Sequence, residues 1–235
     1  KKQSTKIVLF LLGFAIVSCN SLKRVEDDAV LVTKNTIYAD DKKISDENIR
    51  SLIIQESNSN ILGYPLRLNL YNLAKKDPDS SYQAWLARKP KREQRLESLL
   101  SQKQVDRLGE SFVVSGMSEW LKKIGEAPVI LDTSRTRKSL ERLKIYYGTK
   151  GYFNDNATYQ IDTVAKQKVE LAYKISLGKP FIIDSVSKEI ASLPIDSLYN
   201  QHKAGSFIKK GEQFDLNNFN NERERLTNIY RNNGV

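Results

Sequence analysis

The sequence predicts an α+β fold, and three observations lead to this prediction. Residues 157–161 and 169–175 alternate apolar and polar side chains, which is the two-residue period of a half-buried strand. Residues 140–147 instead place apolar side chains at the spacing of one helix face. A short motif that ends such a helix recurs 83 residues further along the chain. These signals together favour helices and hairpins arranged in two repeated units.

Composition limits the classes of protein to consider. Of the 235 residues, 40% are hydrophobic and 28% are charged, a mixture that can bury a core and argues against a disordered or multi-span membrane chain. A single cysteine and a single histidine argue against a disulfide framework, a histidine-rich metal site and a Ser-His-Asp triad. The net charge of +10 comes from bases that interleave with acids rather than cluster.

The N-terminal residues predict an export signal with a lipid attachment site. Three lysines accompany an unbroken apolar run, Ile7–Val17, whose 11 residues are too few to span a membrane. The end of this segment, residues 16–19 (IVSC), resembles a bacterial lipobox, which implies cleavage before Cys19 and a diacylglycerol thioether on its sulfur. An ordinary signal followed by an incidental cysteine is the alternative. Asn20 replaces the aspartate of the usual inner-membrane retention signal, so the resemblance implies the outer membrane.

The next residues predict a tether, a strand and a helix. Residues 20–29 are polar and predict a short tether. β-branched residues are frequent over 30–38, which predicts a strand. Ser45 is the expected N-cap of a helix that continues to Gln55 with apolar residues at helical spacing.

Residues 56–127 differ in character from their neighbours, and we interpret them as an insertion. They contain an apolar stretch at 66–73 and a helical turn closed by glycine at 120–125. Between these, we expect a helix with Leu96, Leu99, Leu100 and Val105 on one face. The basic run 88–92 either contacts anionic lipid or forms a solvated face, and the acids interleaved with it favour the solvated face.

The clearest helix is expected over about 132–150. The candidates for its N-cap are Asp132, Thr133 and Ser134. Strands at 157–162 and 168–176 follow, and residues 163–167 connect them as a hairpin without a glycine. Three further elements are expected: a strand at 181–186, a helix near 195–202 and a last helix at 216–231.

The internal repeat carries the pattern E-R-L-x₃-Y-x₃-G. Its first copy consists of Glu141, Arg142, Leu143, Tyr147 and Gly151, and its second of Glu224, Arg225, Leu226, Tyr230 and Gly234. The leucine and the tyrosine are one helical turn apart and share a face. The glycine stands where the helix must reverse into a strand, which calls for a positive φ or a close backbone approach.

This pattern resembles the POTRA (polypeptide-transport-associated) domain, a β-α-α-β-β unit whose second helix ends in Leu-x₃-Tyr-x₃-Gly-aromatic. The matching residues are Leu143, Tyr147, Gly151, Tyr152 and Phe153 in the first copy and Leu226, Tyr230 and Gly234 in the second. The resemblance covers about 129–235, is fainter for 30–55 and is absent from 56–127. It implies an α+β protein of tandem POTRA-like units, the first with a long helical insertion, after a lipoprotein signal peptide.

The resemblance also implies a division of the chain. Its segments are a signal peptide at 1–18, a lipid-anchored tether at 19–29, a first POTRA-like unit at 30–178 with the insertion at about 56–127, and a second at 179–235. Tandem units of this kind belong to the BamA/TamA-like outer-membrane assembly proteins, and a lipidated, TamA-like form fits the chain best. The second unit stops where its second strand is due, so we expect the sequence to be part of a longer chain.

From this resemblance we expect a periplasmic module, anchored to the outer membrane, that binds unfolded outer-membrane protein clients or a periplasm-spanning partner subunit. Clients would add as a strand to the edge strand after the glycine. The residues of that edge are Asn156, Ala157, Thr158, Tyr159, Gln160, Ile161, Asp162 and Thr163, of which Thr158, Gln160 and Asp162 are expected to point outward. The alternative is a lipoprotein without a barrel that binds a fixed protein partner or an envelope polymer.

Catalysis is not expected. The sequence contains no phosphate-cradling glycine loop, metal-ligand cluster or nucleophile motif, so we expect neither enzyme activity nor a cofactor or metal. His202 is expected on the surface of a helix. The aromatic residues are interpreted as core or half-buried rather than as a base-stacking platform, namely Tyr146, Tyr147, Tyr152, Phe153 and Tyr159. An exported chain also has no ready access to nucleic acid, so we expect no such partner.

Overall fold

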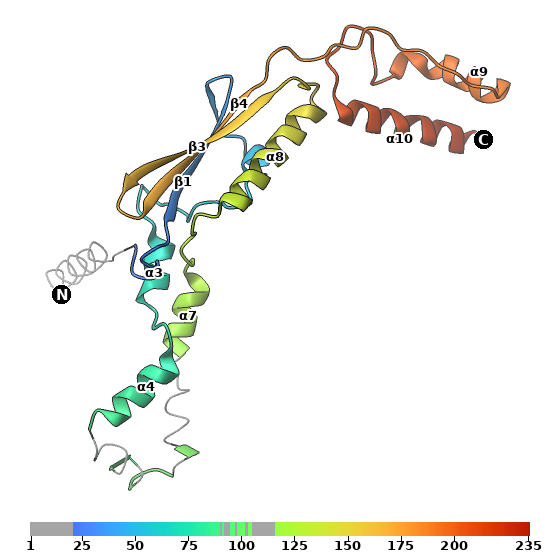
Figure 1. Ribbon diagram of the computed structural model, residues 1–235. Helices are drawn as coiled ribbons and strands as arrows, with labels where there is room; N and C mark the ends of the chain where they lie inside the picture. The colour runs from blue at the N-terminus through green and yellow to red at the C-terminus, as the bar shows by residue number, and fades with distance from the viewer. Residues whose placement is uncertain (1–20, 90, 92–94, 97, 102, 105–115) are drawn as a thin grey trace, which may run out of the picture. The chain divides into compact units, whose positions relative to one another are not determined.

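The computed structural model describes residues 21–89, 91, 95–96, 98–101, 103–104 and 116–235. It is an α+β structure, as predicted, and the described part contains one four-stranded mixed sheet and seven α-helices (Figure 1). The chain divides into two compact units. The described parts of Lys1–Lys34, Glu56–Leu131 and Thr163–Glu170 form what we call the insertion unit. Asn35–Gln55, Asp132–Asp162 and Leu171–Val235 form what we call the repeat unit.

The sheet has the strand order β2-β1-β4-β3. The strands are β1 at Leu31–Ala39, β2 at Lys42–Ile44, β3 at Asn156–Ala165 and β4 at Lys168–Ser176. β1 and β2 pair antiparallel. β1 and β4 run parallel, because the Leu31 N–H donates to the Gln167 carbonyl near one end and the Asp40 N–H donates to the Ile175 carbonyl near the other. β3 and β4 follow each other in a hairpin, and this leaves β3 at one end of the sheet order.

Helix α8, Thr133–Thr149, supplies the buried helix face of the repeat unit and lies along the sheet (Figure 1). Asp132 is its N-cap, and the Asp132 carboxylate accepts the N–H groups of the second and third helical residues. Leu140, Leu143 and Tyr147 are buried on α8. The alternation predicted for β4 is confirmed, since its inward residues are at most 4% exposed, namely Val169, Leu171, Tyr173 and Ile175.

The C-terminal part of the repeat unit contains α9 at Leu193–His202, a 3₁₀ turn at Lys203–Gly205 and α10 at Leu216–Asn232. Both helices were predicted, and they lie side by side (Figure 1). His202 is exposed, as expected. The strand predicted at 181–186 is wrong. Residues 181–183 instead form an isolated bridge and three backbone hydrogen bonds with 211–214, and this pairing is too short to make a strand.

The insertion unit contains α3 at Leu66–Leu73, α4 at Pro78–Ala87 and α7 at Met117–Ile124. α3 and α7 pack against each other. Gly125 is the C-cap of α7, as the sequence indicated, and a Cβ on it would lie 2.6 Å from the backbone nitrogen of Tyr71 in α3. A glycine is therefore required for this close approach of the two helices.

The described part of the predicted tether, residues 21–29, is not free chain. Lys23 Nζ and Arg24 Nη2 donate to carbonyls at the C-terminal end of α3, at 2.8 and 2.5 Å. Gln167 Nε2 donates to three carbonyls between residues 26 and 29, at 2.8 to 3.3 Å. These bonds hold the segment at both ends, which its polar composition did not indicate.

The helix predicted from Ser45 to Gln55 is wrong in its cap and its length. The N-cap is Asp46, and α2 covers only Glu47–Arg50. The Ile54 N–H donates instead to the Ser139 hydroxyl at 2.9 Å. Tertiary hydrogen bonding thus takes a backbone group that a longer helix would have used.

Two further local predictions are corrected. β2 was not predicted, because two of its three residues are lysines and its conformation depends on pairing with β1. The hairpin connection is shorter than the predicted 163–167, since only Lys166 and Gln167 lie between β3 and β4. Gln167 adopts a φ of +56° in the place where a glycine was missing from the turn.

The helix expected around Leu96 falls partly outside the described residues, which exclude 97, 102 and 105–115. Within the described part, residues 98 and 99 form a turn and Leu99 is 82% exposed. Leu96 and Leu100 pack against Leu86 of α4. Of the basic run 88–92, residues 90 and 92 also lie outside the described part.

Candidate functional site

The strand predicted to bind clients, 156–163, lies within β3 at the end of the sheet (Figure 1). Among the strands that the structure describes, β3 has a neighbour on one side only, so a row of its N–H and C=O groups faces away from the sheet. The strand at the other end, β2, has only three residues, whereas β3 has ten. β3 is therefore the longest strand edge in the described part of the chain.

The side chains of β3 are covered only at its beginning. Ala157 and Tyr159 are half-buried, and the three residues expected to point outward are exposed, namely Thr158, Gln160 and Asp162. Ile161 was expected on the covered face, yet it is 38% exposed. Val164, on the opposite face, is 52% exposed. The second half of the strand thus presents side chains to solvent on both faces.

On one face of the sheet, hydrogen bonds fix the polar side chains of Gln160 and Asp162. Gln160 Nε2 donates to Asp162 Oδ1 at 2.7 Å, and Lys174 Nζ of β4 donates to Gln160 Oε1 at 2.9 Å. In a strand, side chains stand perpendicular to the direction of main-chain pairing. An incoming strand would therefore meet the main chain of β3 rather than these groups.

Gly151 joins α8 to the segments that follow it. It has a φ of +88°, in the left-handed region, as the sequence predicted. Its carbonyl accepts the Phe181 N–H at 2.8 Å, and a Cβ on it would lie 2.8 Å from the carbonyl oxygen of Phe214. The position therefore requires glycine for its backbone angle and also for its surroundings.

The aromatic residues near Gly151 differ in burial. Tyr147 is 6% exposed, and Tyr152, half-buried, meets the Tyr147 ring edge-on with 6.2 Å between ring centres. Phe153 was expected to be core or half-buried, and this is wrong, because it is 52% exposed. Its ring nevertheless contacts those of Phe181 and Phe214, with centres 5.2 and 5.3 Å away.

α8 and α10 end in the same way. Each has 17 residues, follows an aspartate N-cap, and is followed by one further residue and a glycine of positive φ, +88° at Gly151 and +73° at Gly234. The Tyr147 carbonyl accepts the N–H groups of residues 150 and 152 at 3.0 and 3.1 Å. The Tyr230 carbonyl accepts those of residues 233 and 235, both at 3.1 Å. All of these pairs are 83 residues apart, so the repeated motif has the same local structure twice.

The two copies differ in how far they are buried. Leu143 is 0% exposed in α8, whereas Leu226 and Tyr230 of α10 are only half-buried. Glu222 is the one buried residue of α10 among those described. The apolar face of α8 is buried, and the corresponding face of α10 is therefore only partly covered.

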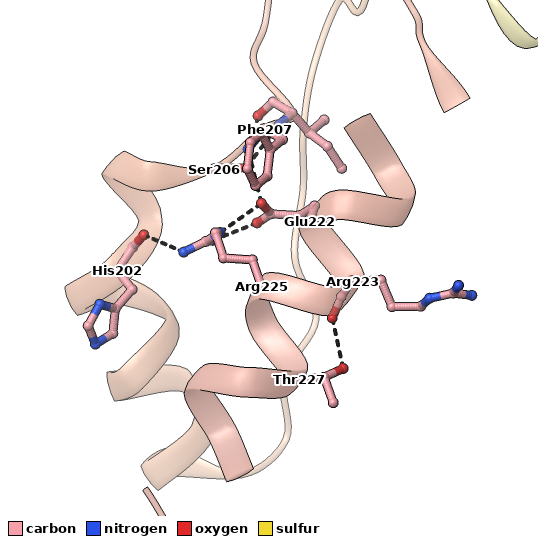
Figure 2. Close-up of polar contacts among 8 residues, drawn as sticks. His202, Ser206, Phe207, Glu222, Arg223, Arg225 and Thr227 are labelled. Atoms are coloured by element: carbon pink, nitrogen blue, oxygen red, sulfur yellow. Dashed lines mark hydrogen bonds and ion pairs between the residues drawn. The ribbon is translucent and has the colours of Figure 1, made fainter. Parts of the chain in front are cut away.

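A buried ion pair connects α10 to the end of α9 (Figure 2). Glu222 is 5% exposed, and its carboxylate accepts Arg225 Nε and Nη2 at 2.9 and 2.7 Å and the Phe207 N–H at 3.0 Å. Arg225 Nη1 also donates to the His202 carbonyl at the end of α9, at 3.0 Å. Hydrogen bonding by Arg225 holds the pKa of Glu222 below its ordinary value, despite the opposing effect of burial.

The same helix position in α8 is occupied by Ser139, which is fully buried. Ser139 Oγ accepts the Ile54 N–H at 2.9 Å, as Glu222 accepts the Phe207 N–H. The donor and acceptor are 85 residues apart for Ile54 and Ser139 and 15 residues apart for Phe207 and Glu222, a difference of 70. That difference is close to the length of 56–127, the stretch interpreted as an insertion.

The titratable groups of the described residues form no metal-ligand cluster, and some of them have shifted pKa values. No group of three or more potential metal ligands gathers in the described part of the chain. Burial raises the pKa of Tyr147 and of Tyr173, and each is a buried residue facing the core of the repeat unit. The main-chain edge of β3 is the predicted binding site that the described part of the chain leaves unpaired on one side.

The predicted lipidation site, Cys19, and the signal peptide at 1–18 lie outside the described residues, which begin at Ser21. Within the described ranges, none of the helices combines the length and apolar character needed to cross a bilayer. A scan against protein-family models finds no match to the chain, and neither does a search of curated proteins.

Proposed function

We propose that the chain is the periplasmic POTRA module of an outer-membrane protein assembly or translocation factor. The exposed edge of β3 is the observation that carries this proposal. An unfolded client adds to such an edge as a further strand, and main-chain hydrogen bonds supply the affinity. The matching ends of α8 and α10 support the interpretation of two copies of one unit.

The edge is long enough to hold an extended segment. The ten residues of β3, at about 3.3 Å per residue, give roughly 33 Å of strand. Alternate residues turn their N–H and C=O groups outward, so about half of them are available to a client. Because these groups are common to all sequences, binding by this edge is tolerant of client sequence, as an assembly factor requires.

Proline substitutions in β3 test strand addition. Thr158→Pro and Tyr159→Pro each remove one N–H and add a ring, and because neighbouring residues face opposite ways, one of them lies on the outward edge. We expect that variant to lose at least about fivefold in crosslinking of unfolded outer-membrane clients to residues 156–163, since a main-chain hydrogen bond contributes about 1 kcal/mol. Photo-crosslinking in cells provides the measurement.

The controls are Thr158→Ala and Gln160→Ala, which keep the backbone donors and should leave crosslinking nearly unchanged. Circular dichroism must first show that each variant is folded. Normal crosslinking by folded variants at both positions would exclude strand addition at β3. Loss of one constant partner after alanine substitution, with clients unaffected, would favour the alternative of a lipoprotein with a fixed partner.

The proposal includes an anchor at Cys19 in the outer membrane, facing the periplasm. Cys19→Ser removes the thiol to which a diacylglycerol group is attached, so we expect an uncleaved precursor or release of the protein from membranes. Mass spectrometry of the N-terminal peptide and membrane fractionation after a carbonate wash give the readouts. An unchanged mass and unchanged partitioning would show that Cys19 is not the anchor.

A further inference from the structure

A cationic cavity lies within the insertion unit and shares no residue with the β3 edge. Its volume is about 760 Å³, within the range of small-molecule sites. Its walls come from residues 23–26, from Tyr71 and residues 73–76 at the end of α3, and from α7 and the chain that follows it. Five cations and a single acid line it: Lys23, Arg24, Lys75, Lys76 and Lys122, with Glu26.

Two of the cations, Lys23 and Arg24, are fixed in the cavity wall by contacts with the end of α3. Lys23 and Arg24 donate to the carbonyls of Asn72 and Ala74, where the C-terminal end of α3 carries partial negative charge. The Arg24 guanidinium also lies 4.7 Å from the centre of the Tyr71 ring. A lysine ammonium has three donors and a guanidinium has five, so both side chains retain N–H groups for a ligand.

Of the three other cations, only Lys122 has an acidic partner among the described residues. Lys75 and Lys76 form no ion pair with any acid in the described part of the chain. Lys122, which is half-buried, lies 3.6 Å from the exposed Glu119 and donates to the Lys76 carbonyl at 3.4 Å. Like charges gathered in this way repel each other, and a bound anion would relieve the repulsion.

The cavity also has an apolar part. Leu73 is 54% exposed, and Val25, Ala74, Ala127 and Pro128 line the same space. A ligand that fits these walls has a compact negative group for the lysines and an apolar portion for Leu73. An anionic lipid has this combination, whereas inorganic phosphate has only the charge.

Chain length places the cavity close to the proposed anchor. Lys23 follows Cys19 by four residues. An extended chain spans at most about 3.6 Å per residue, so the two Cα atoms lie within about 14 Å of each other. A lipid on Cys19 would hold the cavity within reach of the headgroups.

We infer that this cavity binds the phosphate headgroup of an anionic glycerophospholipid of the membrane that carries the anchor. The inference rests on the proposed function only for the lipid on Cys19, which brings the cavity to the bilayer. Binding of a soluble lipid analogue requires neither that modification nor a client. The cavity would orient the insertion unit on the membrane surface beside its own anchor.

The test is a calorimetric titration of the full 235-residue chain with dihexanoyl phosphatidylglycerol, below its micelle concentration. We expect binding at least about tenfold tighter than that of dihexanoyl phosphatidylcholine, whose choline cation cancels the phosphate charge. Lys75→Gln combined with Lys76→Gln should weaken binding about 25-fold, because each cation near anionic lipid contributes roughly fivefold. The matched control, Lys209→Gln with Lys210→Gln, removes the same charge from an adjacent exposed pair and should change affinity less than about twofold.

Equal affinity for the two lipids, or equal losses in the two double variants, would overturn the inference. Inorganic phosphate is the third probe, and binding as tight as that of phosphatidylglycerol would assign the cavity to free phosphate instead. If the Lys75/Lys76 variant does not fold, Ala127→Glu replaces it, since it adds an acid to an exposed wall position and should cause a comparable loss. None of these substitutions touches β3, so failure of the cavity and failure of strand addition are separate results.

Discussion

Replacing Gly151 by valine should lower the free energy of unfolding of the repeat unit by about 2–6 kcal/mol. A φ of +88° costs a β-branched residue about 1–3 kcal/mol. The new Cβ would also lie 2.8 Å from the Phe214 carbonyl oxygen, and forced overpacking costs a further ~1–3 kcal/mol. That carbonyl cannot move freely, because the Phe214 N–H donates to Phe181, whose own N–H donates to Gly151. Urea denaturation followed by circular dichroism measures the loss.

Other glycines separate the two contributions. Gly234 has a φ of +73° with no atom within 4 Å of a Cβ, so Gly234→Ala should show the backbone cost alone, about 1 kcal/mol. Gly151→Ala should cost more, because it adds the contact with Phe214. Gly148→Ala lies in a helix with open space around it and should raise stability by ~0.5–1 kcal/mol. Equal losses at Gly151 and Gly234 would contradict the role given to the Phe214 contact.

Glu222→Ala should destabilise the α9–α10 region by about 2–4 kcal/mol. The Glu222 and Arg225 side chains are only 7% and 17% exposed, and removing one partner of a buried pair leaves the other charge poorly solvated. The Phe207 N–H would lose its acceptor as well. Hydrogen exchange of the Phe207 amide should therefore accelerate far more than that of amides in α8. Unchanged exchange at Phe207 would show that the pair does not hold this segment.

The pH dependence of the same region has a defined sign. Arg225 lowers the pKa of Glu222 in the folded protein below the ordinary value of 4.5, so the carboxylate binds its proton more readily when the chain unfolds. Its contribution to stability is complete above pH 4.5 and disappears as the pH falls through the lower folded value. Glu222→Gln should remove this dependence, which begins as the pH falls below about 4.5. An equally steep loss of stability in Glu222→Gln would assign the acid sensitivity to other carboxylates.

Local signals predicted the elements whose hydrogen bonds are themselves local. α8 and α10 each begin at an aspartate cap and end before a glycine. Their predicted ranges, about 132–150 and 216–231, lie close to the observed ones. β4 was recognisable because burial of every second residue leaves an alternation in the sequence. The positive φ of Gly151 followed from the same reasoning, since a helix that reverses there needs one.

The failures occur where distant residues decide the local structure. Gln167 holds a positive φ in the hairpin turn while its side chain donates to three carbonyls more than 130 residues earlier. The helix after Asp46 stops early because Ile54 bonds to Ser139, 85 residues later. Residues 181–183 form no full strand because their apolar run meets only a short partner at 211–214. None of these partners is visible in a local sequence pattern.

The candidate site was predictable in place but not in detail. The alternating pattern after a helix and a glycine located the strand of Asn156–Ala165, and the resemblance to POTRA units implied that it forms an edge; the observed strand order places it at the end of the sheet. The exposure of Ile161 was not predictable, because alternation identifies a face without showing how far the neighbouring elements cover it. The cationic cavity was missed since its lysines come from three separated segments.

The pairing of β1 with β4 sets the order in which the sheet can be completed during synthesis. Thr33 and Val169, joined by a hydrogen bond between these strands, are 136 residues apart. A chain made from its N-terminus therefore carries β1 without its parallel partner until nearly three-quarters of the 235 residues exist. Closing so long a loop is entropically costly, and sheets built on distant pairings fold slowly. Completion of the sheet is thus a late step, and the buried face of α8 gains its full cover only when β4 is in place.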